Sequence, residues 1–418
     1  MPEQPESAPR KPAARLMIVA LVALGLVVRL ALALMIGEGQ AAQPPGSDEF
    51  LAIGKSVTEG KGFVLAQDPP GLSRVAWRMP GYPVLVSAAD RLTATSLRGL
   101  TVFQSICGAA TLIVAGWAAV RLAGLWAGLA AVALVAFDPY QVYFAALAVP
   151  VVPTGLALAA AMALGLEFLV SAASSRWAWF WAAATGVALA AAAYLQPWAA
   201  GLAIPAGVAA IVARRCRRIL AGWAVGTAVL VICLAPWAAR NALRLGVPVL
   251  TTDTGAKLYG GTEGSRGTGG EAGKQEPAGE AKGLDEIRQD VSYLRSAAGL
   301  MAEHPAAWLQ EAALRAGRLW SPGPMLAEDE GPVHPAAGYT SLLPTAVLAL
   351  LGVWALRRER AVLVWLLLAP LWLTLVQAVL GSAPPDRLAV MPPLAVLGGV
   401  GLLAILGRGK TANTGAPI

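Results

Sequence analysis

Two adjacent carboxylates, Asp48 and Glu49, stand in a polar stretch of an otherwise apolar chain. The stretch, residues 37–99, lies between two long apolar runs, so we expect it at a membrane surface. It also carries Arg78, followed directly by a Pro-Gly-Tyr-Pro turn at 80–83. A carboxylate at a membrane surface can take the proton from an acceptor hydroxyl during group transfer. We therefore expect a general base in this acidic pair.

Cations on the same side of the membrane could bind a negatively charged leaving group. A phosphate leaving group needs no strong acid, but its developing charge must be balanced. Arg78, Arg240 and Arg387 are the candidates. Arg387 lies in a short loop just before an apolar run, against the bias of cations toward the inner side. It either binds phosphate or simply pairs with the neighbouring Asp386.

Other polar and aromatic residues have both a chemical and a structural interpretation. Asp138 precedes Pro139 and either supplies a second carboxylate to the site or only ends a helix. Tyr82 and Tyr143 could stack on a substrate, although tyrosines are enriched at the interfaces of any membrane protein. Both interpretations stay open for each residue.

The residue types present give little support for a metal or a nucleic acid. No metal-ligand spacing connects the cysteines and histidines, which are Cys107, Cys216, Cys233, His304 and His334. Asp48 and Glu49 could bind a divalent metal, but further spaced ligands are missing, so we assign no cofactor. The net charge of +7 arises mostly from cations at the ends of apolar runs, so we expect no nucleic-acid partner.

These residues must be positioned by a multi-pass helical membrane protein. Hydrophobic residues make up 57% of the 418 positions and charged residues 14%, whereas a soluble domain has about a quarter of its residues charged. The mean hydropathy is +0.61. We predict an all-α integral membrane fold in the lipid bilayer, with about ten spans and external loop helices. The spans are expected at 16–36, 100–120, 122–137, 153–170, 177–195, 198–213, 219–238, 341–356, 361–380 and 388–407.

The distribution of cations predicts how these spans are oriented. With ten spans and a cytoplasmic N-terminus, the dense basic clusters fall on the cytoplasmic side, as the positive-inside rule requires. These are Arg121, Arg176, the run 214–218, the run 357–360, and Arg408 with Lys410. We therefore expect both termini in the cytoplasm, the candidate residues on the external or periplasmic side, and the cell inner membrane as the location.

The spans and loops divide the chain into five parts. A cytoplasmic tail at 1–15 precedes an N-terminal transmembrane core at 16–240, which includes the external loop 37–99. The external segment 241–340 contains a Gly-rich flexible part at 260–283 and amphipathic helices at 284–320. C-terminal membrane helices at 341–407 and a cytoplasmic tail at 408–418 complete the chain.

Three sequence blocks, in order, resemble one enzyme family. Pro236-Trp237 with Arg240-Asn241, followed by Leu258-Tyr259 and Gly261, resembles the Pro-Trp-x-x-Arg-Asn … Leu-Tyr-x-Gly block of bacterial family 39 glycosyltransferases. These are relatives of protein O-mannosyltransferases and lipid A aminoarabinose transferases. The pattern from Asp48 to Pro83 resembles the first loop of that family, and 385–393 resembles its late Arg-Tyr-x-x-Pro step.

The resemblance implies the GT-C architecture, in which a multi-helix membrane core carries an active site on its external side. It implies transfer of a sugar from a polyprenyl-phosphate-linked donor to a lipid, glycan or protein acceptor. Asp48 matches the catalytic first-loop aspartate, with Glu49 as the alternative one position along. Arg240, Asn241 and Tyr259 lie in the matching block and become candidates for substrate binding.

The chain also departs from the family pattern. Phe50 stands near the place of a tyrosine, Pro150 to Pro153 replace a Ser-Glu pair, Gln196 replaces an arginine, and Leu388 replaces a tyrosine. The departures indicate either a changed donor or acceptor, or a catalytically degenerate protein that serves as a binding or partner subunit.

Two further classes of function remain for comparison. A secondary transporter would have ionisable residues near mid-span and repeated halves, and we identify neither. A polymerase or ligase that acts on external glycans is close in chemistry and is poorly separated by sequence.

Overall fold

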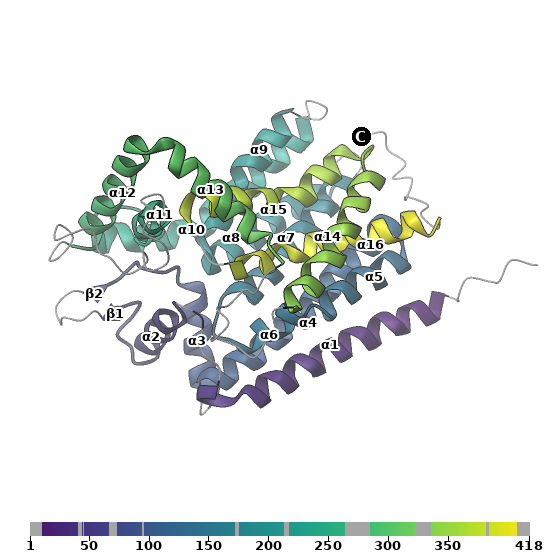
Figure 1. Ribbon diagram of the computed structural model, residues 1–418, viewed down its shortest axis with the longest axis horizontal. Helices are drawn as coiled ribbons and strands as arrows, with labels where there is room; N and C mark the ends of the chain where they lie inside the picture. The colour runs from purple at the N-terminus through teal and green to yellow at the C-terminus, as the bar shows by residue number, and fades with distance from the viewer. Residues whose placement is uncertain are drawn as a thin grey trace, which may run out of the picture.

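The computed structural model describes residues 11–40, 44, 46–66, 73–93, 96–171, 175–212, 217–263, 285–322, 336–381 and 384–407. The described chain is almost entirely helical (Figure 1). Its strands are β1 (Leu65–Ala66) and β2 (Ser73–Arg74), an antiparallel pair in which Leu65 lies opposite Arg74.

Eight helical segments in the described residues are long and apolar enough to cross a membrane. They are α1 (Lys11–Gln40), α4 (Ser96–Ala123), α7 (Val151–Ser171), α8 (Ala178–Leu195), α10 (Arg217–Leu245), α14 (Ala337–Ala355), α15 (Arg360–Leu380), and α16 (Met391–Ile405) with the preceding 3-10 helix η5 (Pro384–Val390). In hydrocarbon every backbone polar group must be satisfied internally, and a helix achieves this within one segment. The predicted all-α multi-pass membrane fold is confirmed.

Two of the three shortest predicted spans differ from straight helices. In place of the span 122–137, α5 (Leu125–Ala136) is followed after a 62° bend by α6 (Pro139–Tyr143) and η1 (Phe144–Ala146), which together can count as a ninth span. The bend lies at Pro139, which disfavours helical geometry at the residue before it. The run 198–213 forms η2 (Pro197–Leu202) and α9 (Ala203–Val212), whose apolar part is shorter than the other spans.

Helix α16 lies at the centre of the bundle and α1 at its edge (Figure 1). In its most apolar window α16 is 83% buried, whereas the corresponding window of α1 is 17% buried. Glycines allow α14 and α16 to approach closely. A Cβ atom at Gly352 would lie 2.0 Å from the carbonyl oxygen of Leu397, and one at Gly401 would lie 2.1 Å from that of Leu348. Small residues at helix contacts are typical of membrane bundles.

Shorter helices gather at one end of the bundle (Figure 1). These are α2 (Ser47–Thr58), α3 (Gly81–Leu92), α11 (Thr254–Glu263), α12 (Glu286–Glu303) and α13 (Pro305–Leu319). Helix α11 packs on α12 and α15, and α13 packs on α15. Of the segment 260–283 that we predicted to be flexible, residues 260–263 belong to α11 and the rest lies outside the described residues.

Candidate active site

The acidic pair lies in the first turn of α2. Gly46, with φ of 85°, brings the chain into this helix, and the amide groups of the first turn favour negative charge there. Asp48 is exposed, and no hydrogen bond or ion pair reaches its carboxylate within the described part of the chain. Glu49 Oε2 accepts hydrogen bonds from Trp77 Nε1 at 2.9 Å and from Arg78 Nε at 2.7 Å. The two carboxylates are therefore in different states: Glu49 is held by partners and Asp48 is available.

Arg78 connects the first loop to the segment after α10. Its Nη1 donates to Asp253 Oδ2 at 2.7 Å, and Lys257 Nζ lies 2.8 Å from the same oxygen. Asp253 is 2% exposed. Burial alone would raise the pKa of Asp253, but Lys257 and Arg78 outweigh burial and bring this pKa below its ordinary value. Asp253 thus stays ionised as the shared partner of two cations.

Glu286, the first residue of α12, links the first loop to the segment that follows α10. Its carboxylate accepts hydrogen bonds from the backbone amides of Val75 at 2.7 Å and Ala76 at 3.0 Å. It also accepts one from the Thr252 hydroxyl at 2.5 Å, and the Thr252 amide donates to the Ala76 carbonyl at 3.0 Å. We call Glu49, Arg78, Asp253, Lys257 and Glu286 the loop cluster.

Asp290 lies one helical turn after Glu286 and accepts a hydrogen bond from the Gly255 amide at 2.6 Å. Burial raises the pKa of Asp290 to about 6; the Gly255 amide opposes this shift, and the nearby carboxylates Asp253 and Glu286 add to it. Asp253 and Asp290 are therefore neighbouring carboxylates whose pKa values are shifted in opposite directions.

Arg240 and Asn241 anchor the chain where α10 turns toward the loop cluster. Arg240 Nη1 donates to the Val75 carbonyl at 2.6 Å and to Asn241 Oδ1 at 2.8 Å, and its guanidinium lies 4.7 Å from the centre of the Trp237 ring. Asn241 is fully buried, and its Nδ2 donates to the Val249 carbonyl at 2.8 Å. Both side chains thus hold protein groups in this structure.

A second polar group surrounds the break between α5 and α6. Asp138 is 2% exposed and caps α6, because its Oδ1 accepts hydrogen bonds from the amides of Tyr140 at 2.9 Å and Gln141 at 3.1 Å. Its Oδ2 accepts a hydrogen bond from Ser341 Oγ at 2.9 Å. Of the two interpretations of Asp138, the helix-boundary role is directly visible.

Arg29 of α1 contacts the other side of this break. It is 1% exposed and donates to the carbonyls of Gly25 and Val135, each at 3.0 Å. Val135 lies in the last turn of α5, where carbonyl groups lack helical partners and favour a cation. Our sequence analysis identified no ionisable residue near mid-span, and Arg29 corrects this. A single arginine within the apolar run 16–36 was the available signal.

Arg387 of η5 is fully buried near the same break. Its Nη1 donates to the carbonyls of Leu319, at 3.0 Å, and Ser321. Its Nε and Nη2 have no hydrogen-bond acceptor within the described residues. The Asp138 carboxylate interacts electrostatically with Arg387 and also with Arg29. We call Arg29, Asp138, Ser341 and Arg387 the helix-break cluster.

The predicted aromatic site residues are packed against other side chains. Tyr82 is fully buried, donates to Gln104 Oε1 at 3.0 Å, and meets the Phe50 ring edge-on with centres 5.2 Å apart. Tyr259 is 7% exposed, and its ring centre lies 5.7 Å from that of Tyr293. A substrate contact by either tyrosine stays a prediction.

The structure therefore brings some of the predicted site residues into two groups, and Asp48, Tyr82 and Tyr259 belong to neither. Glu49 and Arg78 meet in the loop cluster, which Arg240 contacts through the backbone of Val75, while Asp138 and Arg387 meet in the helix-break cluster. The sequence analysis missed Asp253 and Glu286. No group of three or more metal-ligating His, Cys, Asp or Glu side chains occurs within the described ranges.

No protein-family model and no curated protein matches this sequence. Solved structures do resemble it. The oligosaccharyltransferase AglB from Archaeoglobus fulgidus, in complex with an inhibitory peptide and a dolichol-phosphate, superimposes with a TM-score of 0.57 at 12% identity, over 96% of this chain and 52% of that one. Its apo form gives a TM-score of 0.56 at 12% identity, over 93% and 50%.

The chain has the GT-C membrane fold. ArnT from Cupriavidus metallidurans bound to undecaprenyl phosphate is also similar, with a TM-score of 0.46 at 14% identity, over 93% of this chain and 78% of that one. We base the GT-C assignment on the archaeal enzyme, whose TM-score is higher. This chain spans about half the length of that enzyme. The GT-C architecture expected from the sequence blocks is thus confirmed at the level of the fold.

Proposed function

We propose that this GT-C protein is a membrane glycosyltransferase that moves a sugar from a polyprenyl-phosphate donor to a lipid, glycan or protein acceptor. The observation that carries the proposal is the contrast within the acidic pair of α2. Asp48 is exposed and unpaired within the described residues, whereas Trp77 and Arg78 hold Glu49. A base must be free to accept a proton, so Asp48 is the better candidate.

In this reaction Asp48 takes the proton of the acceptor hydroxyl while the hydroxyl oxygen attacks the anomeric carbon of the donor sugar. The bond from that carbon to the phosphate oxygen breaks, and its electron pair leaves with the polyprenyl phosphate. The sugar is transferred with inversion at the anomeric carbon. No nucleotide is needed, because the lipid phosphate already serves as the leaving group.

Arg387 is the best candidate for binding the donor phosphate. Two of its nitrogen atoms, Nε and Nη2, have no acceptor among the described residues, and the guanidinium is buried, where charge-assisted hydrogen bonds are strong. Arg78 and Arg240 already donate to protein oxygens. We therefore assign to these two arginines the positioning of the loop cluster beside the donor. The dolichol-phosphate in the archaeal complex supports a lipid phosphate as ligand of this fold.

We further propose that the short helices at one end of the bundle face the external or periplasmic side of the cell inner membrane. Helix α1 begins, and α16 ends, at the opposite end of the bundle (Figure 1). The basic turn at 357–360 between α14 and α15 lies at the end of the spans that the positive-inside rule assigns to the cytoplasm.

A second candidate is a binding or partner subunit on the same scaffold. The observation that favours it is the packing of Tyr82 and Tyr259, together with the absence of a carboxylate at 150–153. Such a protein would bind a lipid-linked sugar without transferring it, and neutral substitution of Asp48 would leave its binding intact.

The test is sugar transfer by the purified full-length protein in lipid, supplied with a panel of polyprenyl-phosphate sugars. We expect release of polyprenyl phosphate with at least one donor, and a loss of about 10²–10⁴-fold in Asp48→Asn. Glu59→Gln is the matched control, because Glu59 directly follows α2 and pairs with the exposed Lys61. This control should retain parent activity.

The alternatives give different results. Loss in Glu49→Gln with full activity in Asp48→Asn would move the base by one residue. No turnover with any donor, combined with donor binding that is lost in Arg387→Gln, would favour the partner subunit over the enzyme.

A further inference from the structure

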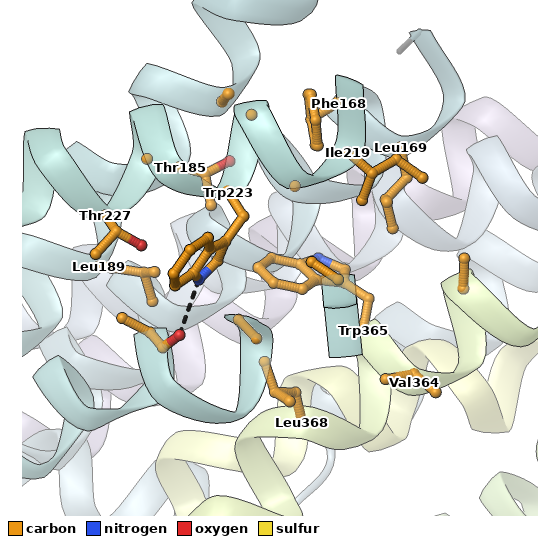
Figure 2. A pocket seen from close by; sticks show the side chains of 18 of the residues that line it. Phe168, Leu169, Thr185, Leu189, Ile219, Trp223, Thr227, Val364, Trp365 and Leu368 are labelled. Carbon is orange, nitrogen blue, oxygen red and sulfur yellow. Dashed lines mark hydrogen bonds between the residues drawn. The ribbon is translucent and has the colours of Figure 1, made fainter. Parts of the chain in front are cut away.

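A large apolar cavity lies among α7, α8, α9, α10 and α15, away from both clusters described above. Its volume is about 800 Å³, within the range of roughly 300–1,000 Å³ that is typical of small-molecule sites. Figure 2 shows aromatic and aliphatic side chains on its wall, with the indoles of Trp223 and Trp365 at its centre. The lining is thus suited to a hydrocarbon chain.

The aromatic wall of this cavity is fixed in place. Trp223 Nε1 donates to the Ala203 carbonyl and Trp365 Nε1 to the Met162 carbonyl, each at 2.9 Å. Glycines allow both indoles to pack closely against neighbouring helices. A Cβ atom at Gly165 would lie 2.1 Å from the Trp365 ring, and one at Gly207 would lie 2.5 Å from the Trp223 ring. The cavity is therefore bounded by indole rings with satisfied N–H groups.

The cavity lies at the opposite end of the spans from the candidate active site. It is lined by the end of α7 and the beginnings of α8, α10 and α15, from Ile219 to Leu230 in the case of α10. Arg240, beside the loop cluster, comes ten residues after Leu230. From Ile219, the first lining residue of α10, to Arg240 the helix rises about 32 Å at 1.5 Å per residue, about the thickness of a bilayer core. A phosphate at this cavity therefore cannot be the donor phosphate at the candidate site.

Arginines line one end of this apolar cavity. Arg357, Arg358 and Arg360 line it at the turn between α14 and α15, together with one carboxylate, Glu359. The side chains of Arg358 and Arg360 are exposed. Arg360 is also the first residue of α15, where the amide groups of the helix start favour an anion. An apolar cavity with a cationic rim is complementary to a lipid that has an anionic headgroup.

We propose that this cavity binds one anionic phospholipid from the leaflet that faces the arginines. An acyl chain occupies the space beside Trp223 and Trp365, and the headgroup phosphate contacts Arg358 and Arg360. The site is separate from the sugar-transfer site, and the proposal does not depend on transferase activity. The proposal predicts that the cavity selects lipids by headgroup charge, whereas a groove filled by bulk lipid would not.

The test uses the full-length protein, stripped of lipid in a neutral detergent and titrated with phosphatidylglycerol or phosphatidylcholine of identical chains. Native mass spectrometry counts the one-to-one adducts. We expect tighter binding of phosphatidylglycerol, and a loss of this preference in the double variant Arg358→Gln/Arg360→Gln. A basic residue near a membrane surface strengthens anionic-lipid binding about fivefold, so the pair accounts for roughly 30-fold.

Two further variants distinguish binding of the acyl chain from binding of the headgroup. Ala206→Phe places a ring in the cavity and should weaken binding of both lipids. Arg176→Gln removes an exposed cation just before α8 that does not line the cavity, and should leave binding unchanged. Equal binding of the two lipids by the parent, an unchanged preference in the double arginine variant, or full binding by Ala206→Phe would each overturn the proposal.

Discussion

The loop cluster and the helix-break cluster place arginines beside carboxylates in contrasting ways. In the loop cluster, Arg78 is bound by the side chains of Glu49 and Asp253, and the Arg78 and Glu49 side chains retain 18% and 31% exposure. In the helix-break cluster, Arg29 and Arg387 are buried and donate mainly to backbone carbonyls. The partly exposed Arg78–Glu49 pair can exchange partners with water, whereas a buried arginine held by carbonyls cannot do so without moving helices.

This difference indicates a different role for each cluster. Within the loop cluster the Arg78–Glu49 pair can rearrange, because partly exposed ion pairs contribute little stability and are easily exchanged. The helix-break cluster keeps Arg387 buried in a fixed position, and its Nε and Nη2 atoms have no acceptor among the described residues. Under the proposed function, the rigidly held Arg387 binds the donor and the more adaptable Arg78–Glu49 pair adjusts to the acceptor, an arrangement suited to transfer between two different substrates.

The largest expected effect is on the helix-break cluster. Asp138→Ala removes the cap of α6 and leaves Arg29 and Arg387 without their shared carboxylate. Removing one partner of a buried charge network costs about 3–5 kcal/mol. We expect the free energy of unfolding to fall by this amount, measured as thermal or denaturant unfolding in detergent.

Ser341→Ala is the control for this variant, since it removes one hydrogen bond to Asp138 and leaves the charge in place. We expect it to cost about 1 kcal/mol. If Asp138→Ala were as stable as Ser341→Ala, the two clusters would not differ in the way described above.

The fold was predictable from the sequence because every segment that crosses lipid must satisfy its own backbone polar groups, and a long apolar helix does so. Eight of the ten predicted apolar runs correspond to helices long and apolar enough to cross a membrane, and the two exceptions are among the shortest runs. Pro139 bends the run at 122–137, and the run at 198–213 begins with the 3-10 helix η2. A hydrophobic run gives the length of a helix, but not its bend or its depth.

The candidate site was predictable only in part. Asp48, Glu49 and Arg78 stood out because they were polar residues in one loop between apolar runs. Asp253 and Glu286 did not, because their partners in the first loop lie 175 and about 210 residues away in the chain. No local pattern encodes such a pairing.

The next effect concerns the carboxylate that joins the distant segments of the loop cluster. Asp253→Asn removes the charge shared by Arg78 and Lys257, and hydrogen bonds to charged groups contribute about 1.5–3 kcal/mol. Because the pKa of Asp253 is lowered in the folded protein, ionised Asp253 stabilises the fold at pH values above its unfolded pKa of about 4. This stabilisation is lost as the pH falls through the folded pKa. We expect weaker hydrogen-exchange protection of 250–258 and no such acid dependence in the variant.

Lys257→Met provides the comparison, since Lys257 is half-buried and its ion pair contributes less. If residues 250–258 were as well protected in Asp253→Asn as in the parent, Asp253 would not hold the loop cluster together.

The smallest expected effect has the opposite dependence on pH and comes from Asp290. Its pKa is raised to about 6, so the stability contributed by its protonated form is complete below about pH 4 and is lost as the pH rises through 6. The contact between α11 and α12 should therefore be more protected at pH 5 than at pH 7.5. We expect a difference of about 1 kcal/mol, because Asp290 is half-exposed and its charge is screened by water.

Hydrogen exchange of 254–263 and 286–303, expressed as protection relative to the free peptide rates, measures this difference. Asp290→Asn should abolish it, because an amide does not titrate but can still accept the hydrogen bond of the Gly255 amide. Asp253→Asn should reduce it, because the Asp253 charge is one cause of the raised pKa. Higher protection of the parent at pH 7.5, or an equal slope in Asp290→Asn, would contradict the opposite shifts of these two carboxylates. Asp253 would then stay ionised without an opposing titration at Asp290, and the contact between α11 and α12 would not loosen as the pH rises.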